Sequence, residues 1–347
     1  MTAWVECSGL AKQLGTKQVL SGLDLSVERG EILSILGPSG SGKTTLIRLI
    51  AGLADPDAGE IAIAGKTVFG PRTNTPIERR GVGYVFQDYA VWPHMTVAAN
   101  VAFGLELAGL GRADRDIRVR EALTSVDIAE LADRFPDQLS GGQQQRLALA
   151  RSLAMRPEVI LLDEPLSNVD AALREHLRLE ILQLVRAHNT TAIYITHDQS
   201  EAMALCDRLA VMQGGRLLQA GKPEELYRRP NSLFVASFLG GANVLQGEME
   251  NGVFTTQGLR LVSRSAAPGP AVDLVFRPED AAPAEAHPEN RLSGAVVACM
   301  FLGRCWRVTL RAADLMFQLD WPVQVMPSAI LDFSVTPDRC ALVPSGS

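Results

Sequence analysis

The spacing of apolar and polar residues predicts two kinds of β-strand in the first part of the chain. Trp4–Cys7 and Leu23–Val27 alternate apolar and polar side chains, which is typical of antiparallel strands with one solvated face. Between them, Gly9–Gly15 is predicted to form a turn. Glu31–Leu36 is a short apolar run that indicates a buried strand, and Val159–Asp163 is apolar on both faces, as expected for a central parallel strand. Together these patterns indicate an α/β domain.

A block of helical periodicity interrupts this domain. Thr96–Leu105 and Arg118–Leu131 carry apolar residues at helical spacing, which predicts a helical subdomain over about residues 88–157. The charged residues of Arg112–Arg120 are interpreted as a solvated helix face, with a binding patch as the alternative. A further helix is expected from Ala171 to about Ala187, followed by the strand Thr191–Thr196.

The pattern changes again near residue 240. Gly240–Gly241 ends the α/β pattern, and short alternating runs between turns follow, which is typical of a small β-barrel or sandwich. We therefore expect two domains, one of residues 1–240 and a β-rich one of residues 241–347.

Composition narrows the class of protein without identifying a function. Among 347 residues, 47% are hydrophobic and 21% are charged, which is ordinary for a globular protein. The net charge of −6 and the pI near 5.5 give no electrostatic reason to expect nucleic acid as a partner. No apolar run approaches the roughly 18 residues that span a bilayer, and no export signal is evident. Five cysteines without a C-x-x-C pair indicate free thiols in a reducing compartment, hence a cytoplasmic protein.

One glycine-rich stretch predicts a phosphate-binding loop. Gly37–Thr44 has the spacing G-x-x-x-x-G-K-[ST], in which glycines let backbone N–H groups turn inward to form an anion-binding nest. Lys43 can reach the outer phosphates, and the Thr44 hydroxyl can ligate Mg²⁺. A predicted strand precedes the loop and a predicted helix, Thr45–Ala51, follows it, so a helix N-terminus can complete the anion site. The alternative is a turn rich in glycine and serine with a chance Lys-Thr pair.

Polar residues also follow two later strands. Asp163 and Glu164 end one strand, and His197 directly follows Thr191–Thr196. The carboxyl ends of parallel strands meet at the edge where open α/β sheets bind ligands. Singly, Glu164 could be a solvated acid and His197 a satisfied core histidine. Their combination with the phosphate loop favours one site.

The set of motifs resembles the ATP-binding subunit of ABC transporters over about residues 3–240. The matching segments occur in that family's order: Walker A at Gly37–Thr44, the Q-loop at Gln87, the LSGGQ signature at Leu139–Gln143, Walker B at Val159–Asp163 followed by Glu164, the D-loop at Ser167–Asp170, and the switch histidine at His197. The resemblance implies a RecA-like core with an antiparallel β subdomain and a helical insertion.

The resemblance also implies roles for individual residues, with ATP and Mg²⁺ as the bound species. Glu164 would orient the attacking water, His197 would hold the γ-phosphate and the base in register, and Gln87 and Lys43 would assist catalysis by position and charge. The Mg²⁺ site would use Thr44, Gln87 and, through water, Asp163. The implied nucleotide-binding residues are Leu14, Gly37, Pro38, Ser39, Gly40, Ser41, Gly42, Lys43, Thr44, Thr45, Gln87, Asp163, Ser140, Gly141, Gly142, Gln143 and Asp170.

Two of these positions carry further expectations. In the family, the signature motif completes the ATP site of the opposite subunit, which implies a head-to-tail dimer with a second copy or a paralogue. Leu14 stands where the family usually stacks adenine on an aromatic ring, a contribution of about 0.5–1.5 kcal/mol that leucine lacks. Trp4 is the alternative stacking residue if the first strand bends.

The tail beyond residue 240 resembles the oligomer-barrel regulatory domain of importer ATPases. Within that group, Gly65–Phe69 and Ala90–Val97 look most like ferric iron importers, with polyamine, sulfate, phosphonate or sugar importers as alternatives. The implied partners are integral membrane permease subunits and, indirectly, a periplasmic or lipoprotein solute-binding protein, at the cytoplasmic face of the inner membrane. The tail either senses a ligand or stabilises a dimer.

Two other classes share parts of this pattern. A non-transport ABC-type ATPase would carry a long coiled-coil insertion or two cassettes per chain, and this sequence shows neither. A kinase that uses the same phosphate loop would leave Leu139–Gln143 unexplained.

Overall fold

The chain forms two compact units. The computed structural model describes residues 3–167, 169, 171–265, 269 and 271–345, and the units are Met1–Pro223 and Glu224–Ser347. The short helices α7 (Pro223–Arg228) and α8 (Leu233–Phe238) therefore group with the second unit, apart from Pro223 itself. The domain division at residue 240 remains a sequence-based prediction. Among the described residues, no helix is both long and apolar enough to cross a membrane.

A six-stranded sheet forms the centre of the first unit. Its spatial order is β11-β10-β3-β9-β8-β7, and every neighbouring pair is parallel except β10 and β11. Both faces are covered, because Val159 and Leu161 belong to one apolar core while Ile160 and Leu162 belong to the other. The strands are β3 (Ile32–Leu36), β7 (Val82–Val85), β8 (Val159–Asp163), β9 (Thr191–Thr196), β10 (Arg208–Gln213) and β11 (Arg216–Gly221).

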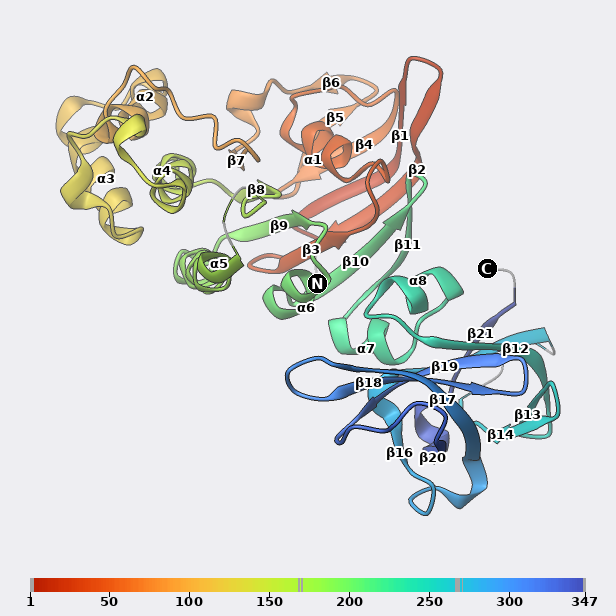
Figure 1. Ribbon diagram of the computed structural model, residues 1–347. Helices are drawn as coiled ribbons and strands as arrows, with labels where there is room; N and C mark the ends of the chain where they lie inside the picture. The colour runs from red at the N-terminus through yellow and green to blue at the C-terminus, as the bar shows by residue number, and fades with distance from the viewer. Residues whose placement is uncertain (1–2, 168, 170, 266–268, 270, 346–347) are drawn as a thin grey trace. The chain divides into compact units, whose positions relative to one another are not determined.

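One face of this sheet carries a helix and a second sheet, and the other face carries helices (Figure 1). On the first face, α1 (Lys43–Ala51) packs within the same core as the antiparallel sheet β2-β1-β4-β5-β6. The strands of that sheet are β1 (Val5–Leu14), β2 (Lys17–Val27), β4 (Ala58–Ile63), β5 (Lys66–Gly70) and β6 (Thr73–Asn74). On the other face, α5 (Ala171–Ala187) and α6 (Gln199–Leu205) share an apolar core with the sheet, and α4 (Gly141–Ala154) packs against β7. Helices α2 (Val97–Leu107) and α3 (Arg112–Ser125) pack on α4 and extend this core beyond the sheet.

The first strand differs from its prediction. Gly9–Gly15 is not a turn, because β1 continues to Leu14 and pairs with β2 up to the Leu14–Lys17 pair. Register shifts between Cys7 and Leu10 let the strand absorb Gly9, whose φ of 59° lies in the left-handed region that glycine tolerates. The two paired strands of this hairpin are therefore longer than the alternation of side chains indicates.

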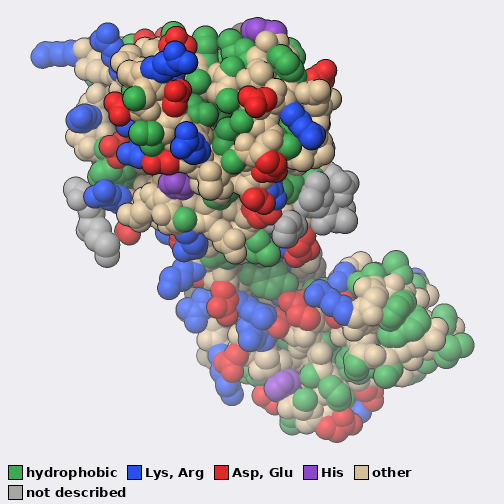
Figure 2. Space-filling view, turned by 90° about the vertical axis from the view of Figure 1, so that its left-hand side faces the viewer, with side chains coloured by type: hydrophobic (Ala, Val, Ile, Leu, Met, Phe, Trp, Pro, Cys, Tyr) green, Lys and Arg blue, Asp and Glu red, His purple; other side chains and the backbone are tan. Residues whose placement is uncertain are grey.

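The charged residues of α3 are of mixed sign, and all except the half-buried Arg115 and Arg118 are solvent-exposed. Arg112 and Asp116 form an exposed i,i+4 pair at 4.0 Å, and Arg115 pairs with Glu106 at 3.3 Å. Figure 2 shows Lys or Arg side chains interspersed with Asp and Glu on this face of the first unit. This arrangement supports the interpretation as a solvated helix face.

The second unit confirms the expected small β domain. Two five-stranded antiparallel sheets, β14-β13-β12-β15-β21 and β16-β20-β17-β18-β19, enclose one apolar core. Asn243 joins the sheets, because its side chain exchanges two hydrogen bonds with the backbone of Gln318. The strands are β12 (Asn243–Glu250), β13 (Val253–Thr256), β14 (Leu259–Val262), β15 (Ala271–Phe276), β16 (Ala281–Pro283), β17 (Arg291–Phe301), β18 (Trp306–Ala312), β19 (Leu315–Trp321), β20 (Ile330–Val335) and β21 (Ala341–Pro344).

Candidate active site

The carboxyl ends of four parallel strands bring most of the predicted site residues to one edge of the central sheet. The phosphate loop follows β3, Glu164 directly follows β8, and His197 directly follows β9. Gln87 lies in the exposed turn after β7. Because these strands run in parallel, their carboxyl ends share one edge (Figure 1), which is where open α/β sheets bind ligands.

The phosphate loop is packed so tightly that it requires glycine. Gly42, the N-cap of α1, has a φ of 103°, and a Cβ there would lie 2.9 Å from the Val19 carbonyl oxygen. A Cβ at Gly37 would lie 2.3 Å from the Met212 carbonyl oxygen. The buried hydroxyl of Ser41 has no hydrogen-bond partner in the described part of the chain. A helix N-terminus beside an unsatisfied buried donor fits a phosphate group.

Lys43 is turned into this loop. It is 6% exposed, and its Nζ donates to the carbonyl oxygens of Gly37 at 2.7 Å and Pro38 at 3.2 Å. Burial lowers the pKa of Lys43, while the nearby carboxylates of Glu164 and Asp163 act in the opposite direction. The remaining predicted residues at the loop, Ser39, Gly40 and Thr45, lie in the turn and in the first turn of α1.

Asp163 is held by two hydroxyl groups. It is 4% exposed, its Oδ1 accepts from Thr44 Oγ1 at 3.0 Å, and its Oδ2 accepts from the Tyr84 hydroxyl at 2.9 Å. Burial and the charge of Asp163 raise the pKa of Tyr84, so the phenol stays protonated and donates. The sequence analysis did not identify Tyr84, which lies within the apolar run of β7. The Asp163 carboxylate, the Thr44 hydroxyl and the side-chain amide of Gln87, in the turn after β7, carry oxygen atoms of the kind that Mg²⁺ prefers as ligands.

Glu164 and His197 form a second pair at the same edge. Nδ1 of His197 lies 3.0 Å from Oε2 of Glu164, and the imidazole is largely exposed. Glu164 has a φ of 46°, which is uncommon for a residue with a side chain, and its N–H donates to the Ile195 carbonyl at 3.0 Å. Ser167 also donates to the Glu164 carbonyl oxygen at 3.0 Å. The turn thus fixes a carboxylate beside an imidazole that faces solvent.

A buried carboxylate supports the chain on both sides of His197. Glu201 is 4% exposed and accepts hydrogen bonds from the hydroxyls of Tyr194 and Thr196. The Thr196 hydroxyl in turn accepts from the Asp198 N–H at 3.0 Å. No local pattern indicates this network, because a glutamate at the start of a helix is usually solvated.

The signature motif lies on the helical block rather than at the phosphate loop. Ser140 is the N-cap of α4, where its Oγ accepts from the Gln143 N–H and the Gln143 side chain accepts from the Ser140 N–H. Gly141 is exposed, with open space where a Cβ would be, and Gly142 is buried. Helix α4 packs against α2, α3 and β7. Asp170 of the predicted D-loop lies outside the described residues.

The tip of the first hairpin lies beside the phosphate loop. Leu14 is 54% exposed and pairs with Lys17, whose Nζ is 3.9 Å from the position that a Cβ of Gly40 would take. Leu14 therefore lies on the same side of the sheet as the loop, and its contact with adenine stays a prediction. Lys17 adds a cation that the motif pattern did not indicate.

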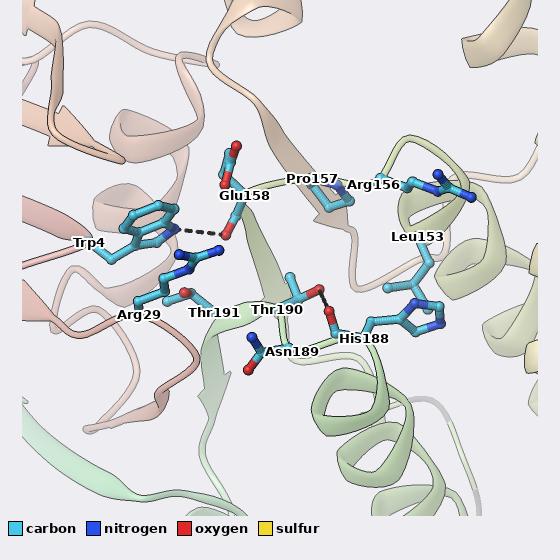
Figure 3. Close-up of a pocket in the computed structure, with 10 residues that line it drawn as sticks. All are labelled: Trp4, Arg29, Leu153, Arg156, Pro157, Glu158, His188, Asn189, Thr190 and Thr191. Carbon is cyan, nitrogen blue, oxygen red and sulfur yellow. Dashed lines mark hydrogen bonds between the residues drawn. The ribbon is translucent and has the colours of Figure 1, made fainter.

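Trp4 lies at the opposite edge of the sheet, so the expectation that it could replace the missing aromatic is wrong. Its indole N–H donates to the carbonyl oxygen of Glu158, the residue before β8, and the Arg29 guanidinium lies 4.7 Å from its ring centroid. Figure 3 shows these side chains around a pocket at the amino ends of β8 and β9. The pocket has a volume of about 270 Å³. The strand does not bend back, because Val5 and Cys7 remain paired with β2.

Comparison with known proteins places the motifs in one family. Residues 20–167 match the family model described as ABC transporter. The chain is 47% identical over 258 residues to the Fe(3+) ions import ATP-binding protein FbpC 1 of Haemophilus influenzae, which covers 74% of this chain and 77% of the relative. It is 45% identical over 306 residues to the Fe(3+) ions import ATP-binding protein FbpC of Brucella abortus, which covers 86% of this chain and 85% of the relative.

Two solved structures share the fold. One is cbiO1 from Clostridium perfringens, part of the ABC transporter complex cbiONQ, with a TM-score of 0.60 and 29% identity over 65% of this chain and 91% of that chain. The other is a dimeric ATP-binding cassette in a post-hydrolysis state bound to ADP and phosphate. It has a TM-score of 0.56 and 30% identity over 63% of this chain and 98% of that chain.

Proposed function

The chain belongs to the ABC transporter family, and we propose that it is the ATP-hydrolysing subunit of an importer for ferric iron. The observation that carries the hydrolytic part is the pairing of Glu164 with His197 at the sheet edge where Asp163 holds Thr44. The relatives named as Fe(3+) import proteins support iron as the solute, since the similarity extends over most of both chains.

Each residue at the sheet edge receives a role from its position. Lys43 and the amides of the phosphate loop neutralise the β- and γ-phosphates, and Glu164 orients and polarises the attacking water. His197 keeps the γ-phosphate and Glu164 in register. Thr44 and Gln87, with Asp163 acting through water, would hold a Mg²⁺ ion, which would supply positive charge against the phosphate oxygens. Catalysis then rests on position and charge.

The signature motif and the D-loop complete a second chain's site in this proposal. Ser140 and the exposed Gly141 lie at the N-terminus of α4, where amide groups and the helix dipole favour an anion. The capping hydrogen bonds between Ser140 and Gln143 fix this helix start, and the open space at Gly141 gives a second chain access to it. The dimeric cassette bound to ADP and phosphate supports a homodimer with two ATP molecules between chains.

The partners follow from the importer assignment. The chain binds integral membrane permease subunits at the cytoplasmic face of the inner membrane and acts, through them, with a solute-binding protein that delivers ferric iron. The cbiO1 structure, which belongs to a transporter complex, supports assembly with membrane subunits. The β-rich second unit is the regulatory domain in this proposal.

The test is ATP hydrolysis by the reconstituted complex with the permease subunits encoded beside its gene. Solute-binding protein is added empty or loaded with ferric iron, spermidine, sulfate or a phosphonate. We expect the ferric form alone to stimulate hydrolysis. Stimulation by another ligand would keep the importer and replace the solute, whereas hydrolysis that no loaded binding protein alters would contradict the importer assignment.

A further inference from the structure

A half-buried arginine links helix α4 to the segment that follows Gln87. Arg151 lies near the end of α4, and its guanidinium donates to the carbonyl oxygens of Ala90 at 2.5 Å and Tyr89 at 3.0 Å. The same group lies 4.8 Å from the Trp92 ring centroid. One side chain therefore contacts three residues of the segment 88–95, which begins directly after Gln87.

This segment has a backbone that needs outside support. Tyr89 and Ala90 have φ angles of 61° and 45°, so two consecutive residues with side chains lie in the left-handed region. Their carbonyl oxygens are the two acceptors of Arg151. The guanidinium fork thus holds the backbone where its conformation is least favourable.

The rest of the segment is also held by the helical block. The Asn100 side chain of α2 is fully buried, accepts from the Trp92 N–H at 2.9 Å, and donates to the carbonyl oxygens of Trp92 and Met95 at 3.1 Å each. The Trp92 ring packs against Phe103 with centroids 4.7 Å apart. At its start, however, the segment continues from β7 and Gln87 at the edge of the sheet.

We propose that Arg151 is a positioning residue that makes the segment 88–95 move together with α4. Helix α4 carries the signature motif in its first turn and Arg151 near its last turn. Because α4 is one continuous helix and Arg151 bonds its far end to the segment, a displacement of Ser140–Gln143 is transmitted to the residues that follow Gln87. A displacement of those residues is likewise transmitted to the signature motif. The inference rests on the proposed function for its consequence in transport, because the segment is then where nucleotide state reaches the permease.

The first test measures hydrogen exchange on the full chain, with Arg151→Met and Arg151→Lys as variants. Methionine fills most of the space but donates no hydrogen bond, and lysine keeps the charge without the planar fork. Arg156→Met is the matched control, because Arg156 is exposed and pairs only with the exposed Glu121 carboxylate at 3.1 Å among the described residues. We expect Arg151→Met to speed exchange in 88–95 by about tenfold or more, with β9 and α5 unchanged.

The second test asks whether ATP binding at one end of α4 still reaches the other. In the wild-type chain with ATP and Mg²⁺, we expect exchange to slow both at residues 140–143 and at 88–95. In Arg151→Met, the change at 140–143 should persist while the change at 88–95 is lost, with Arg151→Lys intermediate. If ATP still slows exchange at both 140–143 and 88–95 in Arg151→Met, the proposal is wrong. Faster exchange throughout the chain of this variant would also overturn it, because Arg151 would then only stabilise the fold.

Transport measurements separate this inference from the function on which it rests. In the reconstituted complex, Arg151→Met should lose most of the stimulation by iron-loaded binding protein, while Arg156→Met keeps it. If the wild-type complex itself is not stimulated, the importer assignment fails, and the exchange results alone decide the role of Arg151. If Arg151→Met is stimulated as strongly as the wild type, the inference about Arg151 fails and the importer assignment stands.

Discussion

Replacing Glu164 by glutamine tests the proposed base with the least change in shape. The carboxylate that lies 3.0 Å from Nδ1 of His197 becomes a neutral amide. The hydrogen bonds that hold the turn, to Ile195 and from Ser167, use the backbone of Glu164 and are kept. The substitution therefore removes the charge that polarises water and little else.

The expected magnitude follows from this geometry. A positioned general base contributes about 10²–10⁴ in rate, which corresponds to roughly 3–5 kcal/mol of the activation free energy. Hydrolysis should fall by that factor. Lys43 and the phosphate loop are unaltered, so the Kd for ATP should change by less than about threefold. Bound ATP that is not hydrolysed should keep the dimer closed.

Three assays check these outcomes, with a control at the residue that precedes the same strand. Phosphate release gives the rate, equilibrium dialysis gives the Kd for ATP, and size-exclusion chromatography with ATP detects the trapped dimer. Glu158→Gln is the control, because Glu158 is exposed and lies at the opposite end of β8. Turnover of Glu164→Gln at the normal rate would refute the assignment of the base, and an equal loss in Glu158→Gln would show that the effect is not local to the site.

Three further substitutions test other contacts. Tyr84→Phe removes one of the two hydroxyls that hold Asp163. Because a hydrogen bond to a charged group contributes about 1.5–3 kcal/mol, the Mg²⁺ concentration for half-maximal hydrolysis should rise about tenfold. An unchanged Mg²⁺ dependence would contradict the role of Tyr84 in supporting Asp163. Lys17→Ala removes the cation beside Gly40, so the Kd for ATP should rise by about threefold to fivefold at low salt and by less at high salt. A loss of ATP affinity that does not depend on salt would indicate that Lys17 acts through packing instead. Arg277→Met removes the donor for four backbone carbonyls, those of Tyr227, Ala236, Leu239 and Gly241. The free energy of unfolding of the second unit, measured by denaturant titration, should fall by about 3 kcal/mol. A loss below about 1 kcal/mol would show that water replaces the arginine as the donor.

Local patterns predicted the parts of the fold that depend on neighbouring residues. The helix Ala171–Ala187 and the strand Thr191–Thr196 begin and end where their periodicity indicated. The phosphate loop was also predictable, because the glycines and Lys43 act within one short segment. The prediction of a turn at Gly9–Gly15 is wrong for β1, because a register shift in a strand, like a turn, favours a glycine with positive φ, here Gly9.

Residue types and spacing predicted the polar groups at the strand ends, whereas the contacts that support those groups arise from the pairing and packing of distant elements. Strand order and register bring Tyr84 to Asp163 and Lys17 to Gly40, and the packing of α4 brings Arg151 to the segment after Gln87. The same register puts Trp4 at the wrong edge of the sheet for nucleotide. The physical reason is that periodicity assigns a side chain to a face of its own element, whereas a hydrogen bond between distant elements depends on how those elements are paired.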